Sequence, residues 1–208
     1  MKAQKLDIEP KKWPTQERSQ RTFDAIVEAC ARLLRQKGYH ALTTNRIAET
    51  AGVGIASVYE YFPGKDAIVA QVATALVTRV MTRLQKRMGD ILDAPPPDAV
   101  HFWIEQIYRT LKDEKALVAV LAYEVPYTSH LPAQKNLTPV LMQFSQAAAN
   151  RAGAPIRETR ADLHLLINLV SSSILQLILD PPQDVTVEDM LAALSTRVEC
   201  WISQPGPG

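Results

Sequence analysis

Residues 44–61 have the sequence TNRIAETAGVGIASVYEY, which meets three requirements of a helix-turn-helix pair. Two helices that cross at about 90–120° need a small residue where they touch, and Ala48 fits this position. The turn between them needs a residue that tolerates a positive φ angle, which Gly52 supplies. Inward-facing apolar side chains are also needed, and the spacing provides Ile47, Ala51, Val53 and Val58. The pattern predicts a helix-turn-helix, and a generic helical hairpin is the alternative.

The second helix of this pair, residues 55–61, leaves few long polar side chains on its outward face: Ile55, Ala56, Ser57, Tyr59 and Glu60. A helix of this kind enters the major groove of DNA, where its side chains meet the edges of the bases. Because the helix is short, one subunit makes too few contacts to select a site. We therefore expect a two-fold dimer on a pseudo-palindromic sequence.

The rest of the 208-residue chain also has apolar residues at helical spacing, and no segment alternates over a sustained run. Glycines and prolines punctuate the pattern. We expect an all-α fold with roughly nine helices, which cover about residues 15–37, 44–51, 55–61, 65–88, 98–111, 113–125, 131–152, 157–179 and 187–202. This pattern predicts a flexible basic arm at 1–14, a helix-turn-helix domain for DNA binding at 15–64, a larger helical domain at 65–203, and a disordered tail at 204–208.

The charge distribution supports a nucleic-acid partner, although the whole chain carries only +1. Up to Lys65 there are 11 basic and 7 acidic residues, a net charge of +4, and the remainder is acidic overall. Two cysteines form no disulfide framework: Cys30 falls on the inner face of its helix, and Cys200 is expected to be exposed. The N-terminus has no apolar leader, and polar residues interrupt the most apolar stretch, 163–179. We expect a cytoplasmic protein with no membrane span.

The sequence around residues 44–61 extends the pattern, with GYHALTT at 38–44 and YEYFPGK at 59–65. Together these motifs resemble the N-terminal domain of the TetR (tetracycline repressor) family over residues 18–70. The resemblance implies a homodimeric transcription regulator, most often a repressor, bound to a double-stranded DNA operator. It also implies release by a small-molecule inducer in the C-terminal domain. The C-terminal domains of the family diverge widely, so the inducer does not follow from the resemblance.

The resemblance implies a set of DNA contacts. Thr44 and Tyr59 would hydrogen-bond phosphates, and Lys65 would pair with a phosphate near a helix N-terminus. Tyr61 would support a backbone contact or touch a base. Arg18 or Arg21 would reach flanking phosphates, and residues 55–57 would approach base edges. The complete expected set is Arg18, Arg21, Thr43, Thr44, Gly54, Ile55, Ala56, Ser57, Tyr59, Tyr61 and Lys65.

Three positions of the second helix give this set its particular character. Gly54 stands where the family often has Ser, which removes a side-chain cap. Ala56 stands where the family often has Gly, and its methyl group favours contact with a thymine methyl. Glu60 either accepts from a cytosine amino group or pairs with Lys65, and we favour the ion pair. We expect DNA shape and the Lys-rich arm to supply much of the specificity.

Two C-terminal helices are candidates for the dimer interface. The helix at 157–179 is apolar on more than one side, and the helix at 187–202 has an apolar stripe. The resemblance implies that both helices belong to a four-helix dimer interface, which would cover their apolar surface. The alternative is that they fill the core of a single subunit.

The middle helices should enclose an inducer pocket that is mostly apolar with a few polar groups. The candidates are polar side chains on apolar faces: His101, Glu105, Tyr108, Tyr123, Tyr127, His164 and Asn168. Each is also compatible with an ordinary core or interface position. His101 and Glu105 offer only two metal ligands, so we expect no metal site and no cofactor.

Two other classes of protein compete with this interpretation. An enzyme is disfavoured because the chain lacks G-x-S-x-G, H-E-x-x-H, paired cysteine motifs and a phosphate-binding glycine loop. A helical scaffold without specific DNA binding is the second alternative. Its affinity for DNA would not depend on salt, whereas that of a regulator falls steeply with salt.

Overall fold

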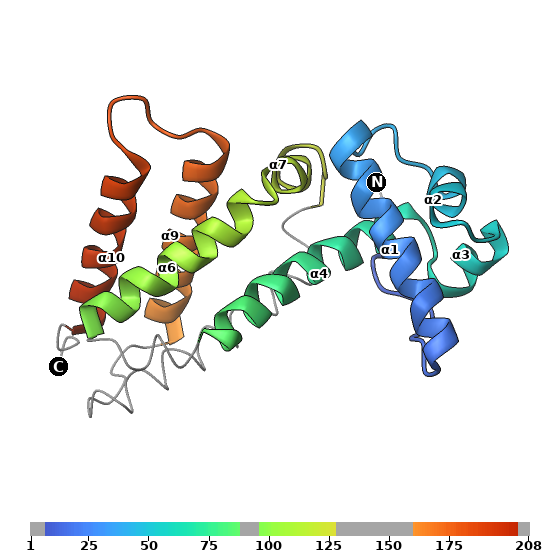
Figure 1. Cartoon of the computed structure of the whole chain (residues 1–208), viewed down its shortest axis with the longest axis horizontal. Helices are drawn as coiled ribbons and strands as arrows, with labels where there is room; N and C mark the ends of the chain where they lie inside the picture. The colour runs from blue at the N-terminus through green and yellow to red at the C-terminus, as the bar shows by residue number, and fades with distance from the viewer. Residues whose placement is uncertain (1–6, 88–95, 128–159, 204–208) are drawn as a thin grey trace. The chain divides into compact units, whose positions relative to one another are not determined.

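The computed structural model describes residues 7–87, 96–127 and 160–203, and every regular element in these ranges is a helix. The expected all-α fold is confirmed (Figure 1). The expected helix at 131–152 lies outside the described residues. The eight described helices are α1 (Glu17–Lys37), α2 (Thr44–Ala51), α3 (Ile55–Tyr61), α4 (Lys65–Lys86), α6 (Pro96–Lys112), α7 (Lys115–Tyr123), α9 (Arg160–Leu179) and α10 (Val187–Ser203).

The chain forms two compact units. The first contains Met1–Val77 and Ala116–Gln134, and the second contains Thr78–Lys115 and Lys135–Gly208. Helix α4 therefore contributes its first half to one unit and its second half to the other, and α7 belongs with the helix-turn-helix. The domains expected at 15–64 and 65–203 stay a prediction.

The first unit is built around α1, which packs against α2 and α3. Ile26, Ile47 and Val58 are completely buried between these helices. Burial of such a side chain contributes about 1.5–3 kcal/mol, so a few of them hold three short helices together. Phe23 adds an aromatic cluster, because its ring centroid lies 4.8 Å from that of Phe62.

The turn between α2 and α3 has the predicted geometry. Gly52 has φ 68° and ψ 31°, the left-handed conformation that favours glycine. Its N–H closes the end of α2, and Val53 donates to the carbonyl of Ala48 at 3.0 Å. Ala48 itself is buried. The small residue and the turn glycine both have the structural roles expected from the sequence.

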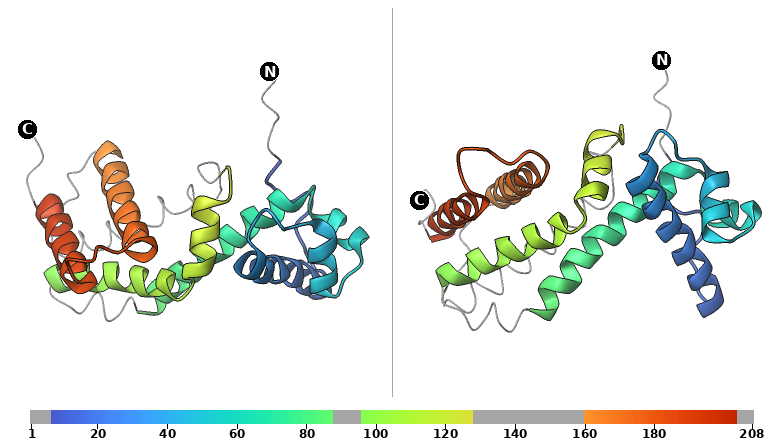
Figure 2. Two further views of the ribbon diagram at one scale, coloured as in Figure 1. Left: turned by 90° about the horizontal axis from the view of Figure 1, so that it is seen from above. Right: turned by 45° about the horizontal axis from the view of Figure 1, so that its top comes forward.

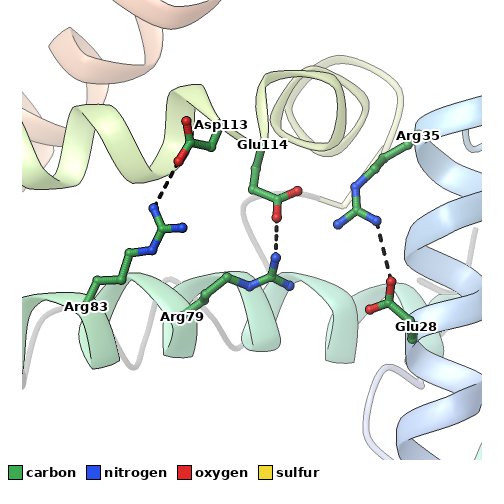
Figure 3. A network of polar contacts seen from close by, with 6 residues as sticks. All are labelled: Glu28, Arg35, Arg79, Arg83, Asp113 and Glu114. Carbon is green, nitrogen blue, oxygen red and sulfur yellow. Dashed lines mark hydrogen bonds and ion pairs between the residues drawn. The ribbon is translucent and has the colours of Figure 1, made fainter. Parts of the chain in front are cut away.

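The second unit packs α6 against α9 and α10 (Figure 2). Its core includes Ile104 of α6, five residues of α9 and three residues of α10: Leu166, Val170, Ile174, Leu177, Ile178, Leu191, Leu194 and Val198. The second half of α4 is joined to the C-terminal end of α6 by two ion pairs, Arg79 with Glu114 and Arg83 with Asp113 (Figure 3).

Among the described residues, α4 is the one helix that could cross a membrane by length and composition alone. Its most apolar window has a mean hydropathy of 1.3, and 56% of that window is buried inside the protein. Such burial is typical of a core helix. Cys30 is buried and Cys200 is exposed, as expected.

Candidate nucleic-acid interface

Helix α3 has an outward face and an inward face, as a groove-binding helix requires. Ile55 is 39% exposed and Tyr59 is 46% exposed, whereas Val58 is fully buried. Ala56 and Glu60 are also exposed, and Ser57 is half-buried. Gly54 is the N-cap of α3 and provides no side-chain hydrogen bond, which confirms the missing cap. The exposed face of α3 therefore combines two aliphatic residues with the Tyr59 ring and the Glu60 carboxylate.

Tyr61 is buried in the structure, which excludes the contact with a base that was one of its two expected roles. Only 5% of the residue is exposed, and its ring lies edge-on to Phe23 with the centroids 5.8 Å apart. The reason is helical spacing: Tyr61 follows Val58 by three positions and so shares its inward face. Tyr61 supports α3 from within the core, which leaves Tyr59 as the exposed tyrosine of the helix.

Two hydroxyl groups expected to bind phosphate lie next to each other. Thr44 Oγ1 and Tyr59 Oη are 3.0 Å apart, at the point where α2 begins. Thr43 caps that helix and accepts a hydrogen bond from the Arg46 N–H at 3.3 Å. A helix N-terminus favours an anion, because its first N–H groups lack partners within the helix. Both hydroxyls were expected from the sequence to contact phosphate, and in the structure they lie within hydrogen-bond distance of each other.

The ion pair expected between Glu60 and Lys65 is wrong. Glu60 pairs instead with Lys12, whose Nζ lies 2.9 Å from Glu60 Oε1. Lys65 contacts Tyr39 instead. Its Nζ lies 4.1 Å from the centroid of the Tyr39 ring and donates to the Tyr39 carbonyl oxygen at 3.4 Å. The difference arises because residues before α1 lie beside α3 and place Lys12 there.

The two arginines expected to reach flanking phosphates are both exposed on α1. Arg21 pairs with Glu17 at 2.5 Å, and both side chains are about four-fifths exposed. An ion pair in water contributes little, so a phosphate can replace Glu17 at small cost. The position of Arg18 and Arg21 is compatible with the expected role, which stays a prediction.

The contacts of Lys11, Lys12 and Trp13 were not expected from the sequence. The N–H of Lys11 donates to the Tyr61 carbonyl at 2.8 Å, and its Nζ donates to the Tyr59 carbonyl at 3.1 Å. The Trp13 ring lies 5.8 Å from that of Phe23. A tryptophan in a charged tract was the available sign that this segment packs on the domain. These residues lie against α3, while the flexibility expected for residues 1–14 stays a prediction.

A second cluster that the sequence did not reveal surrounds Asp66, at the start of α4. The hydroxyls of Tyr39 and Tyr127 both donate to Asp66 Oδ1, at 2.7 and 3.0 Å. Burial and the Asp66 carboxylate raise the pKa of Tyr39 to about 12, and burial together with the same carboxylate raises the pKa of Tyr127. The Tyr39 N–H donates to Glu124 Oε2 at 2.8 Å. Within the first unit, this cluster joins the segment after α7 to the start of α4.

The residues expected to bind the inducer are divided between the two units. In the second unit, His101 Nδ1 is 3.2 Å from Ser195 Oγ, and Glu105 accepts from Arg109 at 2.7 Å. Tyr108 of α6 is buried. His164 and Asn168 are exposed on α9, and the Asn168 side chain donates to the His164 carbonyl at 2.9 Å.

Tyr123 and Tyr127 belong to the first unit instead. Tyr123 is 71% exposed, and the Tyr127 hydroxyl already has Asp66 as its partner. Sequence spacing could not reveal this division, because Tyr123 lies at the end of a helix expected to enclose the pocket and Tyr127 comes shortly after it. The pocket and its residues stay a prediction.

Residues 26–72 match the family model described as "Bacterial regulatory proteins, tetR family". An uncharacterised HTH-type transcriptional regulator of Bacillus subtilis, YuxN, is 25% identical over 157 residues, which cover 73% of this chain and 53% of that protein. The chain spans about half the length of the first curated relatives that it matches.

Solved structures match most of the chain. A TetR transcriptional regulator from Rhodococcus sp. RHA1 has a TM-score of 0.62 at 20% identity, over 90% of this chain and 99% of that one. A putative TetR-family regulator from Mesorhizobium loti has a TM-score of 0.65 at 16% identity, over 90% of this chain and 98% of that one. At these identities the likeness establishes the fold.

Proposed function

The chain belongs to the tetR family of regulators through its helix-turn-helix domain, and we propose that it is a ligand-responsive repressor of transcription. It binds a pseudo-palindromic operator as a homodimer and leaves DNA when a small molecule binds. The observation that carries the proposal is the exposed face of α3 beside the paired hydroxyls of Thr44 and Tyr59. In this proposal the protein acts on DNA in the cytoplasm, as a regulator and not as an enzyme.

In this proposal the interface separates phosphate contacts from base contacts. Thr44 and Tyr59 donate to one phosphate at the N-terminus of α2, where the helix dipole favours the negative charge. Lys65, Arg18 and Arg21 add charge along the backbone, and the main chain at Thr43 and Gly54 comes close to the DNA. Ile55, Ala56 and Ser57 face the base edges, where apolar groups favour thymine methyls.

The dimer is supported by apolar side chains that the described residues of one subunit leave uncovered. Leu165 is 58% exposed and Leu169 is 42% exposed, one helical turn apart on α9. Met190 of α10 is 37% exposed. Contiguous exposed apolar surface commonly marks a protein interface. The inward faces of α9 and α10 fill the subunit core, while the outward faces are available to a second copy.

The response to ligand depends on α4, which begins at Lys65 and whose second half carries Arg79 and Arg83. These arginines pair with Glu114 and Asp113, so the end of α6 is tied to α4 (Figure 3). A ligand that displaces α6 then moves α4. It releases DNA only to the extent that it binds the DNA-free conformation more tightly, and DNA weakens ligand binding by the same factor.

The first test is selection of random duplex DNA on the purified protein. Wild type should recover a palindromic consensus, with an affinity that falls steeply as salt rises. The variant Tyr59→Ala/Lys65→Ala should lose that consensus. Tyr123→Ala removes another exposed tyrosine and should retain it, which makes it the matched control.

Failure of the wild type to enrich any sequence has two explanations that refolding separates. Protein that has been unfolded, freed of small molecules and refolded will bind DNA if a retained inducer was the cause. If the refolded protein still selects nothing, the proposed function is wrong and a helical interaction protein is the better description.

A further inference from the structure

The last carbonyls of α3 accept hydrogen bonds from Lys11, a residue that precedes α1 in the chain. The last carbonyls of a helix lack partners inside the helix, and α3 has only seven residues. Phe62 donates to the Val58 carbonyl at 2.9 Å. Lys11 supplies two further donors, its Nζ to the Tyr59 carbonyl and its N–H to the Tyr61 carbonyl. One lysine therefore closes the end of the recognition helix.

The adjacent lysine neutralises the only charged side chain of that helix. Helix α3 has the sequence IASVYEY, so Glu60 is its sole ionisable carboxylate and no basic residue accompanies it. The Glu60 side chain is 51% exposed, on a helix that is proposed to approach phosphates. Lys12 lies 2.9 Å from the carboxylate, and its own side chain is 58% exposed. Without Lys12, a negative charge would stand unpaired on the DNA-facing helix.

We propose that Lys11–Trp13 is a built element of the DNA-reading surface, in which Lys11 positions α3 and Lys12 determines specificity by masking Glu60. The inference rests on the proposed DNA binding and adds to it. Trp13, which is 61% exposed, adds a ring contact with Phe23 to the two hydrogen bonds of Lys11. With Lys12 present, the outward face of α3 offers the DNA mainly apolar and hydroxyl groups. With Lys12 absent, the free carboxylate repels phosphate and accepts a hydrogen bond from a cytosine amino group.

A double-mutant cycle on Lys12 and Glu60 distinguishes masking from a direct contact between Lys12 and phosphate. The four proteins are wild type, Lys12→Ala, Glu60→Gln and the double variant, compared on the selected operator at one salt concentration. Lys12→Ala should weaken binding by about fivefold, the order expected for one exposed charge pair. The double variant should bind as Glu60→Gln does, because no carboxylate remains to be masked. Repeating the selection on Lys12→Ala should enrich cytosine at one position of each half-site.

The outcomes that overturn the inference differ from those that overturn the proposed function. If Lys12→Ala loses the same factor in both backgrounds, Lys12 contacts phosphate directly and the masking role is wrong. If it loses nothing in either background and selects the same sequence, the segment has no role in DNA reading. If wild type that has been refolded free of small molecules selects no DNA at all, the proposed function fails and the inference fails with it.

The positioning role of Lys11 has a readout that does not need DNA. Lys11→Met keeps the aliphatic stem and removes the Nζ donor, so the amides near the end of α3 should exchange with solvent several-fold faster. Lys11→Arg restores a donor and should return the exchange rates toward those of wild type. Unchanged exchange at α3 in Lys11→Met would show that the Nζ contact does not hold the helix.

Discussion

The two compact units of this protein are built from different kinds of contact. In the helix-turn-helix, the turn and much of the core come from the continuous residues 44–61, which pack on one preceding helix. In the second unit, α6 packs against α9 and α10, which follow it only after a long intervening stretch of chain. Local spacing constrains the first arrangement strongly and the second only weakly. The difference explains why one unit has an identifiable surface for DNA and the other has no assignable ligand.

The units also differ in where their uncovered apolar groups lie. On α3 the exposed apolar residue Ile55 stands among groups suited to a DNA groove. On α9 the exposed apolar residues Leu165 and Leu169 lie one helical turn apart, as in a helix face that packs on another protein. We therefore expect the first unit to bind DNA and the second unit to pack against a second copy of the chain.

The largest expected effect comes from breaking the proposed dimer. Leu165→Glu/Leu169→Glu places two charges on the exposed face of α9, where burial against a second copy would be costly. The variant should be a folded monomer by light scattering. Its operator affinity should fall by roughly 10²–10⁴-fold, because two linked sites no longer bind together. Val185→Glu changes another exposed apolar residue, outside the helices, and should stay dimeric; a dimeric α9 variant would contradict the proposed interface.

A matched pair of isoleucines separates stability from DNA reading in the first unit. Ile47 is completely buried and Ile55 is 39% exposed. Ile47→Ala should lower the free energy of unfolding by about 2–5 kcal/mol. Ile55→Ala should leave unfolding almost unchanged and weaken DNA binding instead. Chemical denaturation and operator titration of both variants measure the contrast, and equal destabilisation would show that Ile55 belongs to the core.

The sequence predicted the first unit in detail because its determinants are short-range. Gly52 has the expected left-handed conformation, and α2 begins at Thr44 as predicted, with Thr43 as its N-cap. The contacts of Glu60 with Lys12, and of Asp66 with Tyr127, join residues that are 48 and 61 positions apart. Helical periodicity contains no information about such pairs, since it states which face a residue occupies and not which distant segment covers that face. The same limit applies to two residues expected in the inducer pocket: His101 lies beside Ser195 of α10, and Tyr127 donates to Asp66 of α4.

Gly38 offers a smaller effect that tests a long-range contact directly. Its φ is +72° with ψ 178°, and a Cβ built there would lie 2.5 Å from Glu124 Oε2. Gly38→Ala should cost on the order of 1–3 kcal/mol, since it combines a conformation nearly restricted to glycine with this close approach.

Two further variants separate the contributions to that cost. Gly54 has φ −67°, and a Cβ added there would have open space around it. Gly54→Ala should therefore change the free energy of unfolding little, and it serves as the control. Glu124→Ala alone is the reference for the double variant, because it has already lost the acceptor of the Tyr39 N–H. In that background Gly38→Ala should cost only the share that comes from the backbone conformation, and no cost at all would mean that the conformation contributes nothing.

The smallest expected effect is a pH dependence that arises from the cluster around Asp66. Burial and the Asp66 carboxylate raise the pKa of Tyr39 from 10 to about 12, and the pKa of Tyr127 is raised as well. Between about pH 10 and 12 the unfolded chain has lost tyrosyl protons that the folded chain retains. Stability therefore falls as pH rises through this window, and the contribution is complete below it.

Tyrosine-to-phenylalanine variants isolate this contribution from the titration of lysines. Tyr39→Phe and Tyr127→Phe each remove one ionisable hydroxyl that donates to Asp66, so stability should fall less steeply between pH 10 and 12 than in wild type. Tyr123→Phe makes the same chemical change at an exposed ring and provides the control. Urea unfolding across this range measures all four proteins. Asp66 lies next to Lys65, at the start of α4. If stability falls less steeply with pH in Tyr127→Phe than in wild type, the segment after α7 is energetically coupled to the start of α4. If stability falls equally steeply in both proteins, that coupling is contradicted.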